Sequence, residues 1–192
     1  ARLPELLELG ERWGIKVATV ADLIAHRLAT EMLVREHVSA DLPTQYGDFR
    51  MRVFRSVVDD LDHVVLQLGD LPEEEDTDAQ PVLVRVHRAD LVGDTFGRFG
   101  AAGDRTLHQA LDRIRSEGSG VLLYLEHQDL KWTGLAAAAG SGATPFRAFG
   151  IGAQILRALG LRRIRPLTSN PRSFKGLKGF GLQIEEFVPL RS

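Results

Sequence analysis

The chain of 192 residues contains no cysteine. It therefore can form neither a disulfide framework nor a thiolate metal site, and it has no cysteine nucleophile. No apolar run approaches the roughly 20 residues that span a bilayer. The formal net charge is −2, so no excess of charge draws the chain toward nucleic acid or an anionic membrane. From these absences we expect a cytoplasmic protein that binds neither a membrane nor nucleic acid.

What the chain does have is material for a folded core. Hydrophobic residues make up 44% and charged residues 26%, which argues against disorder over most of the length. The length fits one medium domain with an appendage. The chain begins at Ala1 without methionine and runs almost directly into a helical pattern. We read this start as a fragment boundary, with a processed terminus as the alternative.

The hydrophobic pattern changes its period along the chain. Helical spacing predicts a helix from Leu3 to Trp13, which Gly14 ends, and a second helix from Asp22 onward. From about residue 38, strand patterns dominate. Strands are predicted at 38–42, 48–57, 62–68, 81–86, 121–125, 163–167 and 182–188, and helices at 104–116 and 149–159. This order predicts an α+β (mixed α/β) domain over 38–192, preceded by a short helical segment within 1–37.

Five segments carry a resemblance to a known family. Residues 81–97 read Pro-Val-Leu-Val-Arg-Val-His-Arg-Ala-Asp-Leu-Val-Gly-Asp-Thr-Phe-Gly. They resemble the signature of GTP cyclohydrolase II, in which Arg-Val-His at a strand end is followed by Ser-Glu-Cys and then Gly-Asp. Segments 42–49, 117–124, 149–156 and 167–171 continue the likeness in family order. The resemblance thus covers roughly 38–190, which makes it more specific than one short motif. It implies the fold of that family and a homodimer.

Residues 1 to about 30 are similar to a different protein, the C-terminal end of 3,4-dihydroxy-2-butanone 4-phosphate synthase. The matching segments are 1–6 and 14–27. In bifunctional riboflavin proteins this synthase precedes the cyclohydrolase in one chain, and the order here agrees. The resemblance implies that 1–37 is the tail of a synthase domain plus a linker. It also implies a magnesium-dependent synthase upstream, a lyase, as the fused partner.

The positions of the zinc ligands depart from the family. GTP cyclohydrolase II holds zinc with three cysteines and leaves a position for water, whose pKa such a site lowers to about 7. The resemblance places Asp90, Ala101 and Gly103 at the three cysteine positions. Alanine and glycine offer no ligand, and one carboxylate is a poor substitute for three thiolates. We therefore predict that zinc is absent and that this domain has no cofactor; recruitment of another metal is the alternative.

The catalytic positions depart as well. The family's proton-accepting aspartate falls on Pro145, whereas its arginine nucleophile is retained as Arg147. An arginine-containing stretch of the family is replaced at 126–135, where no arginine remains, and the segment that follows is shortened. Because a guanidinium needs a neighbouring base and a positioned phosphate to act as a nucleophile, we predict no catalytic residue and a vestigial Arg147.

Some nucleotide-contact positions of the family do survive. They are Arg85, Val86, His87, Glu117, Gly118 and Thr168. Each could equally serve packing, Arg85 as a surface arginine and His87 as a hydrogen-bonded core histidine. The leading prediction is a pseudoenzyme that supports the assembly, stability or regulation of a fused synthase in riboflavin biosynthesis. A sensor that binds a nucleotide or flavin is the alternative, and an active cyclohydrolase with unconventional ligands ranks third.

Overall fold

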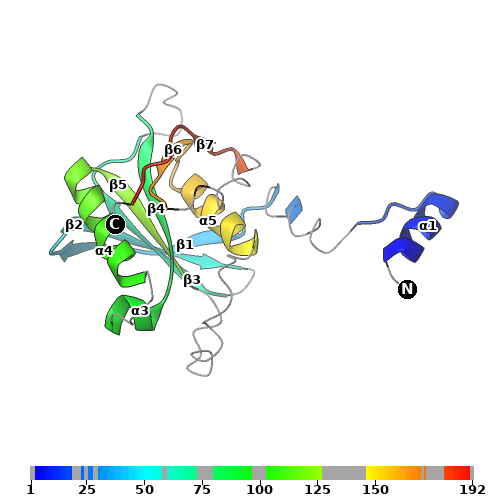
Figure 1. The fold of residues 1–192 in the computed structure, drawn as a ribbon, viewed down its shortest axis with the longest axis horizontal. Helices are drawn as coiled ribbons and strands as arrows, with labels where there is room; N and C mark the ends of the chain where they lie inside the picture. The colour runs from blue at the N-terminus through cyan, green and yellow to red at the C-terminus, as the bar shows by residue number, and fades with distance from the viewer. Residues whose placement is uncertain are drawn as a thin grey trace. The chain divides into compact units, whose positions relative to one another are not determined.

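The computed structural model describes residues 3–18, 23, 26–27, 30–57, 60–72, 80–96, 103–126, 146–169, 171 and 180–190 (Figure 1). The chain divides into two compact units, Ala1–Glu31 and Met32–Ser192. The first contains α1 (Leu3–Trp13), which confirms the helix predicted there. After Gly14, at φ +60°, the chain folds back, and the Ile15 N–H donates to the Gly10 carbonyl at 2.9 Å.

The second unit is built on a seven-stranded sheet in the order β1-β2-β3-β5-β4-β6-β7. The strands are β1 (Val34–Thr44), β2 (Gly47–Ser56), β3 (Asp62–Leu68), β4 (Val82–Arg88), β5 (Gly120–Leu125), β6 (Arg163–Pro166) and β7 (Gln183–Ile184). Antiparallel pairing joins β1, β2, β3 and β5, whereas β5, β4, β6 and β7 are parallel neighbours. The predicted α+β (mixed α/β) class is confirmed.

β1 starts earlier than the sequence predicted. A strand was expected only at 38–42, but β1 runs from Val34 to Thr44 and pairs with β2 along its length. The register shifts between Glu36 and Val38, which marks a β-bulge. As an edge strand, β1 exposes most residues on both faces and so lacks the alternation on which the prediction relied.

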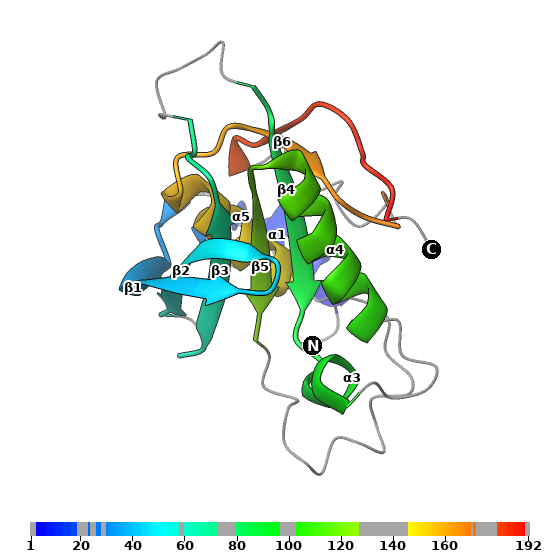
Figure 2. The same cartoon turned by 90° about the vertical axis from the view of Figure 1, so that its left-hand side faces the viewer.

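Within the described residues, three helices accompany the sheet: α3 (Leu91–Phe96), α4 (Gly103–Glu117) and α5 (Phe146–Ala158). In chain order, α3 and α4 stand between β4 and β5, and α5 stands between β5 and β6. Because β5 and β6 flank β4 on opposite sides, right-handed crossovers place α4 and α5 on opposite faces of the sheet. Both views show this arrangement (Figure 1, Figure 2). No helix within the described residues is long and apolar enough to cross a membrane.

β5 is covered on both faces, as its continuous apolar run predicted. Leu122 packs into a core cluster under α4 that consists of Phe49, Leu83, Ala110, Leu111, Ile114, Leu122, Leu167 and Val188. Leu123 and Leu125 face α5, where a Cβ on Gly152 would lie 3.4–3.5 Å from their methyl carbons. The sheet therefore separates two apolar layers, and side chains of adjacent strand positions belong to different layers.

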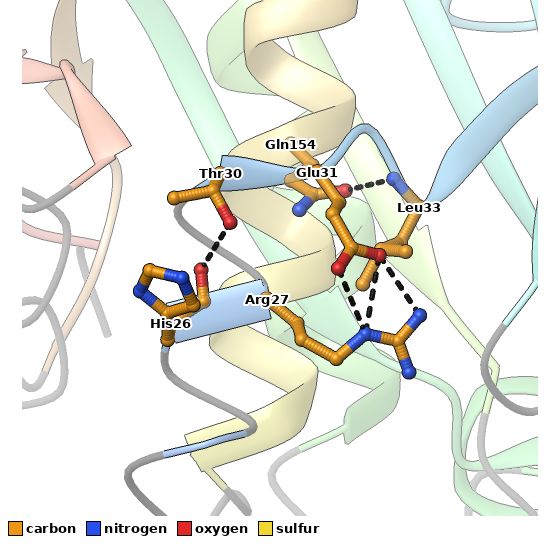
Figure 3. A network of polar contacts seen from close by, with 6 residues as sticks. All are labelled: His26, Arg27, Thr30, Glu31, Leu33 and Gln154. Carbon is orange, nitrogen blue, oxygen red and sulfur yellow. Dashed lines mark hydrogen bonds and ion pairs between the residues drawn. The ribbon is translucent and has the colours of Figure 1, made fainter.

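A buried hydrogen bond fixes the start of β1 to α5 (Figure 3). The Leu33 N–H donates to the Gln154 side-chain oxygen at 2.7 Å, and the Leu33 carbonyl accepts from Val57 at 2.9 Å. Leu33 is 5% and Gln154 4% exposed, so water cannot replace this bond. The same figure shows, in the first unit, the ion pair between Arg27 and Glu31.

Candidate functional site

The topology indicates where a site would form. After β4 the chain continues to α3 and α4, and after β5 it continues to α5 on the opposite face. A crevice is therefore expected at the carboxyl ends of these two parallel strands, where their connections diverge. His87 of β4 and Tyr124 of β5 are register partners near these ends. Their rings are stacked, with centroids 5.4 Å apart.

The carboxylate of Asp94, in α3, is the centre of the polar contacts there. His87 Nε2 lies 3.0 Å and 3.1 Å from its two oxygens, and the Tyr124 hydroxyl donates to it at 2.8 Å. The Asp90 backbone N–H also donates to it, at 2.9 Å. The side chain of Asp94 is 6% exposed and that of His87 4%. This buried carboxylate thus joins α3 to the ends of two strands.

The electrostatics of this cluster follow from burial and from these bonds. Burial by itself raises the pKa of the Asp94 carboxyl, but hydrogen bonds from His87, Asp90 and Tyr124 favour the ionised form, and the net result is a lowered pKa. Burial, followed by the hydrogen bond to Asp94, raises the pKa of the Tyr124 phenol. The site therefore holds an ionised aspartate and a protonated tyrosine at neutral pH.

Arg85 and His87 stand two positions apart on β4 and so face the same side of the sheet. An Arg85 Nη atom donates to the Leu167 carbonyl at 3.2 Å, whereas its buried Nε has no hydrogen-bond partner in the described part of the chain. The buried Nδ1 of His87 likewise has none there. Burial lowers the pKa of the Arg85 guanidinium, although Asp94 opposes this effect. This end of the sheet thus holds a partly buried cation that the described residues compensate only in part.

Two more of the predicted contact residues belong to the same end of the sheet. Thr168, 6% exposed, follows Leu167, and its N–H donates to the Val188 carbonyl at 2.9 Å. Val86 lies between Arg85 and His87 but points to the other face, because its register partner Leu123 faces α5. Only its backbone is available to a site on the α4 face.

Glu117 and Gly118 lie elsewhere, so the six predicted contacts do not form one site. Glu117 is the last residue of α4, and Gly118, at φ +81°, closes that helix before the amino end of β5. The Glu117 carboxylate accepts from Arg165 at 2.6 Å and lies 3.3 Å from Arg113. Because β4 and β5 are parallel, their amino ends lie together at one end of the sheet, and His87 lies near the other end.

The structure describes two of the three positions at which the family resemblance places zinc-binding cysteines, Asp90 and Gly103. The Asp90 carboxylate accepts the Gly93 N–H at 3.1 Å and so serves the backbone of α3. Gly103 is the first residue of α4 and brings no donor atom. Among the described residues, no group of three or more His, Cys, Asp or Glu could hold a metal. Ala101 and Pro145 lie outside the described residues, and Arg147 is described only as a position in the first turn of α5.

Asp94 and Tyr124 were not singled out from the sequence. Both lie inside the segments that carry the family resemblance, in Gly-Asp after β4 and at the end of an apolar strand in β5. A polar residue that ends a buried strand, together with an acidic residue just past the neighbouring strand, is a usable signal once the two strands are taken as parallel neighbours.

Comparisons with known proteins show which family and which relatives the chain is similar to. The GTP cyclohydrolase II family model matches residues 35–189. Riboflavin biosynthesis protein RibBA of Bacillus subtilis is 40% identical over 208 residues, covering 100% of this chain and 51% of the relative. RibBA of Aquifex aeolicus is 38% identical over 209 residues, covering 100% and 50%. The chain thus spans about half the length of these curated relatives. The crystal structure of RibBX, a two domain 3,4-dihydroxy-2-butanone 4-phosphate synthase from A. baumannii, matches with a TM-score of 0.66 and 29% identity, over 100% of this chain and 50% of that one.

Proposed function

This chain belongs to the GTP cyclohydrolase II family, and from that premise we propose that it is a catalytically inactive member. In this proposal the domain supports the assembly, stability or regulation of a fused 3,4-dihydroxy-2-butanone 4-phosphate synthase in riboflavin biosynthesis. The synthase would use magnesium, and the whole protein would be a homodimer. Residues 1–37 would be the tail of the synthase domain and its linker.

The use of the Asp90 carboxylate is the observation that carries the proposal. Its oxygen is bound to the Gly93 N–H, and the Gly103 position has no side chain. A hydrolytic zinc site needs about three protein ligands and an open position for water. The described residues offer no such set, so the attacking water of the family reaction would lack activation.

Two further findings support a fused partner. RibBX is described as a synthase of two domains, and this chain matches half of it. In addition, α1 exposes apolar side chains at helical spacing: Leu6, Leu9 and Trp13 are 42%, 46% and 67% exposed. An apolar face of this kind is typical of a segment that packs against another protein part.

The test is a parallel assay of both reactions on the full-length protein. We expect no turnover of GTP to the ring-opened pyrimidine, less than stoichiometric zinc by elemental analysis, and formation of dihydroxybutanone phosphate from ribulose 5-phosphate. Deleting residues 32–192 should lower synthase stability or activity. A family member with three cysteines is the positive control. Stoichiometric zinc together with GTP turnover would refute the proposal.

A ligand sensor is the second candidate function, and partly buried Arg85 favours it. A buried guanidinium Nε that lacks a hydrogen-bond partner in the described part of the chain is costly, and an anionic ligand would compensate it. Titration with GTP, GMP and flavin mononucleotide tests this, with Arg85→Met as the variant that should lose binding. Arg50→Met, at an arginine that is 61% exposed, is the matched control. No binding at millimolar ligand would leave only the structural role.

A further inference from the structure

The loop between β4 and α3 contains a reciprocal pair of hydrogen bonds. Asp90 directly precedes α3, the N-cap position at which aspartate is among the preferred residues. Its carboxylate accepts the Gly93 N–H at 3.1 Å, and its own N–H donates to the Asp94 carboxylate at 2.9 Å. This is the reciprocity of a capping box, with the returning acid one position later than usual.

Asp94 extends this pair to the sheet. The carboxylate that accepts from Asp90 also accepts from the Tyr124 hydroxyl of β5 at 2.8 Å and lies 3.0 Å from His87 Nε2 of β4. Hydrogen bonds to an ionised group are roughly twice as strong as those between neutral groups. A helix of six residues has little stability of its own, so such side-chain contacts decide whether it forms.

We propose that Asp90 holds the start of α3 in place without a metal, as a helix cap, while Asp94, an aspartate that the family signature shares, joins this helix to the sheet. The proposal rests on the proposed loss of zinc and adds what fixes the backbone at position 90 in its place. At position 90, where the family resemblance places a zinc-binding cysteine, a thiol would be a weak hydrogen-bond acceptor. The aspartate instead fixes the backbone directly. The Cys-to-Asp change thus converts a ligand position into a cap position.

The experiment compares three replacements of Asp90 in the full chain. Asp90→Ser keeps a capping oxygen, Asp90→Ala removes it, and Asp90→Cys brings back the residue type of the family. We measure thermal unfolding with added zinc and with a chelator, and amide exchange at Gly93. Asp112→Ala, at an exposed aspartate of α4, controls for the loss of one negative charge.

We expect the serine variant to unfold within about 1 °C of wild type and the alanine variant about 2–4 °C lower. Gly93 should exchange about 5-fold faster in the alanine variant, which matches the typical effect of losing a cap. The cysteine variant should behave like alanine, and neither zinc nor chelator should shift any Tm. Equal Tm values for serine and alanine, or a chelator-induced drop of several degrees in wild type, would overturn the proposal.

The same samples separate this inference from the proposed function. A wild-type Tm that depends on zinc, without GTP turnover, refutes the metal-free cap and leaves the inactive domain standing. GTP turnover with a Tm that zinc does not change refutes the inactive domain and leaves the metal-free cap standing.

Discussion

Replacing Gln154 by methionine tests whether one buried amide holds the start of β1 against α5. Methionine has nearly the same length as glutamine but offers no comparable acceptor for the Leu33 N–H. Both positions are at most 5% exposed, so the donor would lose its partner where water cannot reach it. The atoms concerned are 2.7 Å apart in the wild type.

The size of the effect follows from that geometry. A buried donor left without a partner costs about 1–3 kcal/mol. In a domain of this size, each kcal/mol of unfolding free energy moves Tm by about 2–4 °C. The apolar methionine offsets part of the loss through its own burial. We therefore expect a Tm that is about 4–6 °C below that of the wild type.

Thermal and urea unfolding, with amide exchange at Leu33, measure this effect. Gln67→Met is the matched control, because the Gln67 amide donates to the Gly69 carbonyl at 3.0 Å in an exposed setting where water replaces it. The control should change the unfolding free energy by less than about 0.5 kcal/mol. Equal Tm values for the two variants, or unchanged exchange at Leu33, would refute the reasoning.

Three further changes test other parts of the fold. Gly120→Ala should cost about 2 kcal/mol or more in urea unfolding, because φ is +153° and the added Cβ would lie 2.9 Å from the Leu83 carbonyl oxygen; wild-type stability would contradict this. Tyr46→Phe removes the 2.6 Å hydrogen bond to His108 and should cost about 0.5–1.5 kcal/mol in the same assay. Since the pKa of Asp94 is lower in the fold than its unfolded value of about 3.9, the stability it contributes is present above that pH and lost as the pH falls through the folded pKa. In Asp94→Asn, the fall of the urea midpoint between about pH 5 and 2.5 should therefore be shallower than in wild type.

The elements with a strong periodic signal were predictable, and the others were not. The apolar run of β5 and the spaced residues of α4 sit between packed layers, so their sequences show the burial directly. β1 is an exposed edge strand in which charged residues stand on both faces. α3 is too short for a periodic pattern, and contacts to residues of β4 and β5 stabilise it. Neither element has a signal in its own segment.

The candidate site was predictable only in its contiguous part. Arg85 and His87 stand in one motif, whereas Asp94 and Tyr124, thirty residues apart, come into contact through the parallel register of β4 and β5. Glu117 was grouped with them by a short motif. Glu117 precedes β5, whereas Asp94 follows its parallel neighbour β4. The two residues therefore lie at opposite ends of the strands.

The division of the sheet into antiparallel and parallel halves has a consequence for the order of folding. β1, β2 and β3 pair through short connections, and hairpins of this kind close within about 1–10 μs. The pairing of β4 with β6 joins Val82 to Ile164, and such distant pairing is slow because a long loop must be closed first. We expect the meander to form early and the β4–β6 half late. Arg85 and Leu167, which share a hydrogen bond, would then be brought together among the last contacts, so this end of the sheet would form long after the hairpin.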